Sequence, residues 1–165
     1  MGRQAKNLKA PCIPTYHSHF IENQSVVGVA YDWGGMDDVD QFQSKLNASH
    51  AAGSHEKEGV SSCTTGVDCS GLLSLCWRQS GKWGTSTIGK IAPTLQNIDR
   101  LTGLRVGDAL NKPGTHIVMF AGYNGDGTID VYEARGSASR VVLTPRNDWA
   151  RFKGYLSIRY KGTVN

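Results

Sequence analysis

The chain of 165 residues contains no apolar run near the length of about 18 residues that a membrane-spanning helix needs. Cysteine is scarce too, with four residues. Four cysteines are too few for a fold built on disulfides, so a hydrophobic core must stabilise the fold. Excess charge of one sign is small, since 18 Lys and Arg stand against 14 Asp and Glu. The resulting net charge of +4 is spread along the chain. We therefore expect neither a membrane span nor a nucleic-acid partner.

Glycine and aromatic residues, in contrast, are plentiful. Twenty glycines accompany four tryptophans, six tyrosines and four phenylalanines, enough apolar material for one core and too much for a disordered chain. The segment from Met1 to Ala10 is polar and basic, and no apolar stretch of a secretory signal follows it. We expect either an intracellular chain or a mature form from which a leader has been removed.

Helical periodicity dominates the first half. Two prolines predict an irregular arm over residues 1–24, and residues 25–165 are expected to form one domain. Asp37 or Asp38 is suited to cap a helix that begins near Val39. A second, buried helix is expected from Cys69 to Gln79.

The ends of this second helix and one further short helix can also be predicted. Asp68 occupies the N-cap position, and Gly81 stands where the helix is expected to stop. Pro93 lies at the first turn of a short helix predicted over Thr94–Ile98. Cys76 falls on the apolar face of the second helix, so we expect it in the core.

The second half changes to the period of strands. Four segments are predicted to be strands: Thr115–Tyr123, Ile129–Ala134, Arg140–Leu143 and Tyr155–Tyr160. A hairpin turn is expected between the first two, with Asn124 opposite Gly127. Helices followed by an antiparallel sheet define an α+β fold.

Cys69 is the first residue after the predicted N-cap. Free backbone N–H groups and the helix dipole favour a thiolate there, and a thiolate is the nucleophilic form of cysteine. Ser70 and Gly71 are small and leave the sulfur accessible. The alternative is a buried structural cysteine, which is the more common role of an arbitrary Cys.

A thiolate nucleophile needs a base, and His116 at the start of an apolar strand is the best placed histidine. In the predicted hairpin register Glu133 faces Val118, on the same side of the sheet as His116, and it would orient the imidazole. A slip of one residue would place Glu133 on the other side. Asp130 is the second choice. The plainer alternatives are a capping histidine and a solvent-facing glutamate.

Three motifs carry a resemblance to a known family. The segment Gly66-Val67-Asp68-Cys69-Ser70-Gly71-Leu72 resembles the Asp-Cys-Ser-Gly signature of the NlpC family of bacterial cell-wall cysteine peptidases. Tyr31-Asp32-Trp33-Gly34-Gly35 is similar to the Tyr-x-Trp-Gly-Gly element that precedes it in that family. Gly107-Asp108 with His116 and its strand is similar to the family's histidine segment, so the resemblance spans residues 28–135.

The resemblance implies a papain-like fold, in which a central helix carries the nucleophile at its N-terminus and packs on an antiparallel β-sheet. It implies Cys69 as nucleophile, His116 as base and Glu133 as the third polar residue, a position at which family members often have His, Asn, Gln or Glu. Tyr31 and the Cys69 backbone N–H would form the oxyanion hole. Asp68 and Ser70 match positions that contact the substrate amine, with a plain N-cap as the alternative for Asp68.

The segment 36–67 is longer than its counterpart in many relatives and is expected to rim the substrate groove. A zinc site is one alternative for its polar residues, but their spacing fits no known ligand pattern. The residues concerned are His50, His55 and Cys63, with His17, His19 or Cys12. A disulfide between Cys12 and Cys63 and two free thiols both stay open.

The resulting hypothesis is a secreted, periplasmic or wall-associated endopeptidase or amidase that cleaves peptidoglycan stem peptides next to D-Glu. It would need no metal or organic cofactor, act as a monomer, and serve wall remodelling or act as an antibacterial toxin. An inhibitor or immunity protein is kept as a second class of partner. Two alternatives stay open: a transferase or deamidase that acts on a protein or lipid with the same Cys and His, and a catalytically silent wall-binding module.

Overall fold

A computed structural model describes residues 25–95 and 102–162. The expected arm, residues 1–24, lies outside the described residues. The chain divides into two compact units. The first comprises the chain up to Gly71 together with Ala134–Val142, and the second comprises Leu72–Glu133 and the chain from Leu143 onward.

The first unit contains helix α1 (Val39–Asn47), whose start is encoded locally. Asp38 is the N-cap: its carboxylate accepts from the Gln41 backbone N–H at 2.8 Å, and the Gln41 side chain accepts from the Asp38 N–H at 3.0 Å. Such a reciprocal capping box satisfies two N–H groups that a helix start leaves without partners. Phe42 is the buried residue of this helix. The expected cap and helix are confirmed.

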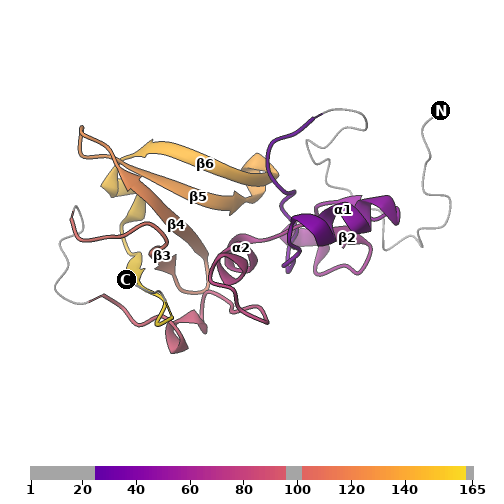
Figure 1. Cartoon of the computed structure of the whole chain (residues 1–165), viewed down its shortest axis with the longest axis horizontal. Coiled ribbons are helices and arrows are strands. Elements are labelled where there is room, and N and C mark those ends of the chain that lie inside the picture. Colours follow the sequence, from indigo (N-terminus) through magenta and orange to yellow (C-terminus); the bar gives the residue numbers. More distant parts are fainter. Residues whose placement is uncertain (1–24, 96–101, 163–165) are drawn as a thin grey trace. The chain divides into compact units, whose positions relative to one another are not determined.

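The segment after α1 forms a small parallel sheet and a turn of 3₁₀ helix. Strand β1 (Ala51–Ala52) pairs with strand β2 (Thr64–Thr65), and a 3₁₀ turn (Glu56–Glu58) lies between them in the chain. Strand β2 lies close to α1 (Figure 1). The segment 36–67, predicted as an enlarged insertion of loop and helix, therefore contains helix α1 and a stretch that is ordered by backbone pairing.

Helix α2 spans Cys69–Cys76, which makes it shorter than expected. Asp68 is its N-cap, since its carboxylate accepts from the backbone N–H of Gly71 at 2.8 Å. The prediction that Gly81 ends the helix was wrong, because Arg78 already takes a left-handed conformation with φ of 52°. The Gln79 N–H then donates to the Ser74 carbonyl at 2.9 Å, as in a Schellman motif.

A five-stranded antiparallel sheet is the main element of the second half of the chain. Its order is β6-β5-β4-β3-β7, and Figure 1 shows β3 to β6 as adjacent arrows. The strands are β3 (Ala109–Lys112), β4 (His116–Tyr123), β5 (Ile129–Arg135), β6 (Arg140–Asn147) and β7 (Leu156–Ile158). Four of them correspond to predicted strands, whereas β3 was not predicted.

The hairpin between β4 and β5 differs from the predicted one at its tip. The Asn124 N–H donates to the Thr128 carbonyl at 2.9 Å, so Asn124 lies opposite Thr128 and not Gly127. Gly127, with φ of 82°, takes the left-handed position of this longer turn. A bulge at Ala121 then absorbs the extra residue, and Phe120 pairs with Val131 as predicted.

Two further expectations need correction. The helix predicted over Thr94–Ile98 is not present at its start, because Thr94 forms an antiparallel bridge with Ile158. Residues 96–98 lie outside the described part. The 3₁₀ turn of this region comes earlier, at Ile88–Lys90.

The core of the second unit is an apolar cluster on one face of the sheet. Phe152, from a 3₁₀ turn (Trp149–Phe152) that we call η5, packs against the strands, and Trp149 and Tyr155 pack on the edge of the cluster. The buried members are Leu104, Leu110, Val118, Phe120, Ile129, Val131 and Phe152. These contacts fix β4, β5 and η5 against one another.

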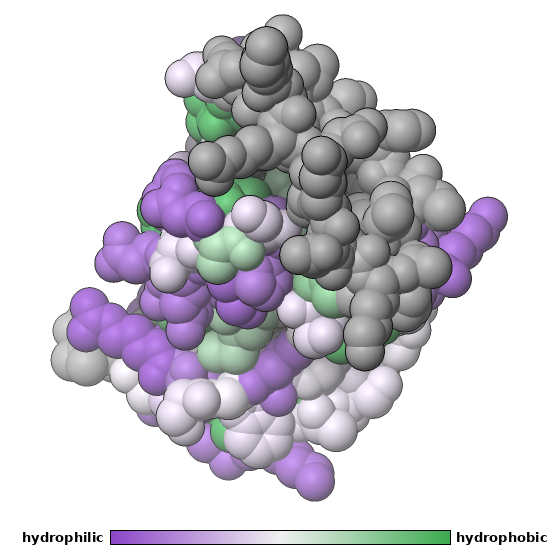
Figure 2. Space-filling view, turned by 90° about the vertical axis from the view of Figure 1, so that its right-hand side faces the viewer, coloured by the Kyte–Doolittle hydropathy of each residue, from purple (hydrophilic) through white to green (hydrophobic). Residues whose placement is uncertain are grey.

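The surface is largely polar where it can be seen. In the coloured part of Figure 2, hydrophilic residues predominate and hydrophobic areas are small and separate. None of the helices in the described ranges has the length and apolar character that a membrane crossing requires.

Two glycines of the family-like motifs permit a close backbone approach in the first unit. A Cβ on Gly71 would lie 2.1 Å from the Gly35 carbonyl oxygen, well inside van der Waals contact. A Cβ on Gly35 would lie 2.5 Å from the Gly66 carbonyl oxygen. The start of α2 therefore packs directly on the Trp-Gly-Gly segment.

We predict that Gly71→Ala destabilises the fold by about 1–3 kcal/mol, because the clash outweighs the gain in helix propensity. Urea unfolding measures this free energy. Gly89→Ala is the control, since a Cβ at Gly89 would meet no atom within 4 Å. Equal unfolding midpoints for the two variants would contradict the packing argument.

Candidate active site

The nucleophile candidate, Cys69, begins α2 in the first unit. It is a free thiol and is partly exposed. The residues on both sides of it, Asp68 and Ser70, are buried. The local fold therefore leaves this sulfur accessible between two polar residues that face inward.

The carboxylate of Asp68 organises the start of this helix. Its Oδ1 accepts from the Gly71 N–H at 2.8 Å and from the Ser70 hydroxyl at 3.0 Å, and its Oδ2 accepts from the Gly34 N–H at 3.0 Å. These three bonds show a structural role for Asp68 as N-cap and as a link to the glycine loop. A contact of Asp68 or Ser70 with a substrate amine stays a prediction.

The segment Tyr31-Asp32-Trp33 is braced by Ser54 from the predicted insertion. The Ser54 hydroxyl donates to Asp32 Oδ1 at 2.6 Å and accepts from the Trp33 N–H at 3.1 Å, while its own N–H donates to the Tyr31 carbonyl at 3.1 Å. Burial raises the pKa of Asp32 even though hydrogen bonds from Ser54 and Thr64 favour its charged form. Ser54 of segment 36–67 therefore helps to fix the conformation of the Tyr31-Asp32-Trp33 segment.

Tyr31 itself is buried in the first unit. Its N–H donates to the Ser139 carbonyl at 2.9 Å. A Cβ on Gly136 would lie 3.6 Å from both the Tyr31 ring and the His55 ring, so the insertion also brings His55 close to this tyrosine. A role of the Tyr31 phenol in an oxyanion hole stays a prediction.

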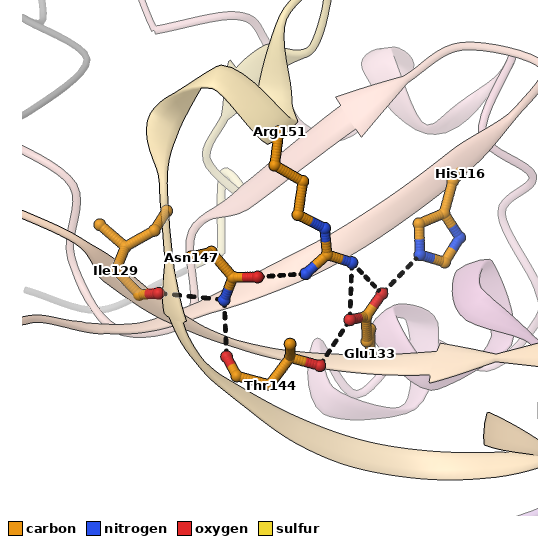
Figure 3. Close-up of polar contacts among 6 residues, drawn as sticks. All are labelled: His116, Ile129, Glu133, Thr144, Asn147 and Arg151. Atoms are coloured by element: carbon orange, nitrogen blue, oxygen red, sulfur yellow. Dashed lines mark hydrogen bonds and ion pairs between the residues drawn. The ribbon is translucent and has the colours of Figure 1, made fainter. Parts of the chain in front are cut away.

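The second unit holds the two remaining candidates, and it brings them together. His116 Nε2 lies 3.0 Å from Glu133 Oε2, as the predicted register requires (Figure 3). The alternative orienter, Asp130, lies near the hairpin tip, where it accepts from Asn124 at 2.7 Å and from the Arg146 N–H at 2.8 Å. Glu133 is therefore the carboxylate that holds this imidazole.

Glu133 is fully buried, and three side chains surround its carboxylate. Besides His116, the Thr144 hydroxyl donates to Oε1 at 2.6 Å, and Arg151 Nη2 lies 2.7 Å from Oε1 and 2.8 Å from Oε2. Burial by itself would raise the pKa of Glu133, but the hydrogen bonds from His116, Arg151 and Thr144 together lower it to about 2.

The ionised state of Glu133 decides which nitrogen of His116 carries hydrogen. A carboxylate can only accept, so the Nε2 that faces it has to be the donor. In the neutral imidazole the lone pair is then on Nδ1. In this arrangement Nδ1 is the ring nitrogen of His116 that can accept a proton; its role as a base stays a prediction.

Sequence reasoning missed Arg151, Thr144 and Asn147. They come from the end of β6 and from η5, and nothing in their spacing distinguishes them from surface residues. Asn147 connects them: it accepts from Arg151 Nη1, and its amide donates to the carbonyls of Ile129 at 3.0 Å and Thr144 at 2.6 Å (Figure 3).

The other cysteines were only partly predicted. Cys63 is disulfide-bonded, which removes it as a zinc ligand, and its expected partner, Cys12, lies outside the described residues. Within residues 25–95 and 102–162, no group of three or more His, Cys, Asp or Glu side chains is arranged to hold a metal. This statement does not extend to His17 and His19.

The prediction of a core position for Cys76 was wrong. Cys76 is a free, exposed residue, although partial burial of its thiol raises its pKa. It lines a cleft of about 430 Å³ in the second unit, beside the stacked rings of Trp77 and Tyr160, whose centroids are 5.4 Å apart. The buried face of the helix runs instead through Ser70, Leu73 and Trp77, which leaves Cys76 on the outer side.

Comparisons with protein-family models, with curated proteins and with solved structures yield no match to this chain. The interpretation of the site therefore depends on its own geometry.

We predict that Glu133 makes stability depend on pH in the acid range. Its folded pKa of about 2 lies below the ordinary 4.5, so its contribution, on the order of 3 kcal/mol, is complete above pH 4.5 and is lost as the pH falls through 2. Unfolding free energies of the wild type and Glu133→Gln, measured between pH 7 and pH 2, should converge as the pH falls.

The control for this titration is Glu56→Gln, which changes an exposed glutamate. This variant should keep the wild-type pH dependence. A constant difference between wild type and Glu133→Gln over the whole range would show that Glu133 takes up no proton in this interval.

Proposed function

We propose that this protein is a papain-like cysteine peptidase or amidase that hydrolyses peptide bonds in bacterial peptidoglycan stem peptides. The observation that carries the proposal is the 3.0 Å hydrogen bond between His116 Nε2 and the fully buried carboxylate of Glu133. A histidine whose tautomer is held by a buried ionised carboxylate is the arrangement that a general base requires.

In the proposed reaction Cys69 Sγ attacks the amide carbonyl of the substrate while His116 Nδ1 takes the thiol proton. The Cys69 backbone N–H and Tyr31 stabilise the oxyanion of the tetrahedral intermediate. His116 then gives its proton to the leaving amine, and a thioester remains on Cys69. Water, deprotonated by His116, hydrolyses this thioester and restores the free thiol.

The substrate class comes from the resemblance of three motifs to the NlpC family, and cleavage next to D-Glu comes from the same source. The disulfide at Cys63 supports an oxidising compartment, and thus a secreted, periplasmic or wall-associated protein. Wall remodelling and antibacterial attack fit these features equally, and an immunity protein would be needed only for the second.

A transferase or deamidase with the same Cys and His is the second candidate. The buried Glu133 and its hydrogen bond to His116 favour both enzyme classes over a silent wall-binding module. Burial of a charge is costly, and in either enzyme class that charge would orient the base.

We predict that iodoacetamide labels Cys69 quickly near pH 6 and that His116→Ala removes this reactivity. The reason is that the proposed imidazolium partner stabilises the reactive thiolate. Both proteins should carry Cys76→Ser, which leaves Cys69 as the free thiol among residues 25–95 and 102–162. Labelling rates are followed by mass spectrometry from pH 5 to pH 9. Identical rate profiles with and without His116 would refute the proposed pair.

We also predict that the purified protein releases soluble fragments from peptidoglycan and that Cys69→Ala abolishes the release. Cys76→Ala is the matched control, since it removes the other free thiol of the described residues and should keep full activity. Mass analysis of the fragments identifies the bond. Equal release by wild type and Cys69→Ala would exclude the mechanism, and no release from any wall type would favour the transferase.

A further inference from the structure

The buried, ionised carboxylate of Glu133 needs a partner whose positive charge does not depend on pH. Thr144 offers a neutral hydroxyl, and His116 is charged only when it is protonated. Arg151 is charged at every relevant pH, and its Nη2 is within 2.8 Å of both carboxylate oxygens. Among the hydrogen-bond donors around Glu133 in Figure 3, it is the one with a permanent charge.

Arg151 is itself held in place. Nη1 donates to the Asn147 side-chain oxygen, and the Asn147 amide is anchored on the carbonyls of Ile129 and Thr144. The guanidinium carbon also lies 5.3 Å from the centre of the Phe152 ring, a cation–π contact with a core residue. The charge beside Glu133 is therefore fixed by contacts to two strands and to the core.

We propose that Arg151 is a positioning residue that keeps Glu133 negatively charged whatever the state of His116. The proton that is exchanged during the reaction then resides on His116 and is not passed on to Glu133. The Nε2 hydrogen stays in place through the cycle, and Nδ1 alone gains and loses a proton. The effect of Arg151 on catalysis rests on the proposed function, whereas its effect on the ionised state of Glu133 does not.

The balance of charge supports this assignment. With neutral His116, the buried carboxylate of Glu133 and the partly exposed guanidinium of Arg151 form a pair without net charge. When His116 gains a proton, the added positive charge is adjacent to Glu133, and Glu133 remains the acceptor. Without Arg151, the neutral state of His116 would leave an uncompensated buried carboxylate, which would take up a proton and donate to the imidazole instead. That exchange would move the lone pair from Nδ1 to Nε2, where it cannot serve the thiol.

The first experiment needs no substrate and no variant. NMR on the intact protein follows the Glu133 carboxyl carbon and the His116 ring nitrogens from pH 4 to pH 9. We expect His116 to titrate with Nε2 protonated throughout, while the Glu133 carboxyl stays ionised. A Glu133 signal that reports protonation together with His116 would overturn the proposal.

The second experiment changes the charge. Arg151→Met should raise the titration midpoint of Glu133 by about four pH units or more, into the range in which His116 is neutral, and Arg151→Lys should largely preserve the wild-type value. Arg146→Met is the matched control, because Arg146 is exposed and pairs with Asp126. An unmoved midpoint in Arg151→Met would overturn the proposal. If Arg151→Met does not fold, the double variant Arg151→Met/Glu133→Gln should fold, because it no longer buries an uncompensated charge. If neither variant folds, the titration of the wild type decides the proposal.

The third readout applies to the enzyme. Arg151→Met should lower kcat by more than about tenfold with little change in KM, add a new acid limb to the pH profile, and be partly rescued by Arg151→Lys. An unchanged pH profile would oppose the assigned role. If the wild type shows no hydrolysis, the proposed function fails, but the NMR titrations still decide the role of Arg151.

Discussion

The second unit is organised around one constraint, the burial of the Glu133 carboxylate. This group has no exposed surface, so its charge has to be balanced by partners supplied from three other elements. β4 contributes His116, β6 contributes Thr144, and η5 contributes Arg151. Phe152, adjacent to Arg151, is at the same time part of the core, so apolar packing and charge compensation depend on the same turn.

In the first unit, the corresponding constraint is close contact between backbones. Gly71 lets α2 begin against the Gly35 carbonyl, and Asp68 joins the same helix start to the Gly34 N–H. The residue types of these motifs therefore have a structural reason that does not require catalysis. The thiol of Cys69 takes part in none of these hydrogen bonds, so they give no structural reason for a cysteine at this position.

Much of the fold could be predicted because it depends on local signals. The capping box at Asp38, the N-cap at Asp68 and the alternation in β4 and β5 are encoded within a few residues. The register that places Glu133 beside His116 was predicted correctly although the turn was not, because the bulge at Ala121 offsets the longer turn. Arg151 could not be predicted, because its contact depends on how η5 folds back on the sheet. The early end of α2 was missed as well, since the left-handed conformation falls on Arg78 and not on a glycine.

The bulge at Ala121 separates the two ends of the hairpin. On the far side of it, toward the tip, the chain uses a longer turn, while on the near side the strands keep the pairing that brings His116 to Glu133. The pairing of His116 with Glu133 therefore does not depend on the length of the turn between β4 and β5. Natural variation or engineering that lengthens or shortens the tip can be absorbed there, whereas a single deletion between Ala121 and His116 would turn the imidazole to the opposite face of the sheet.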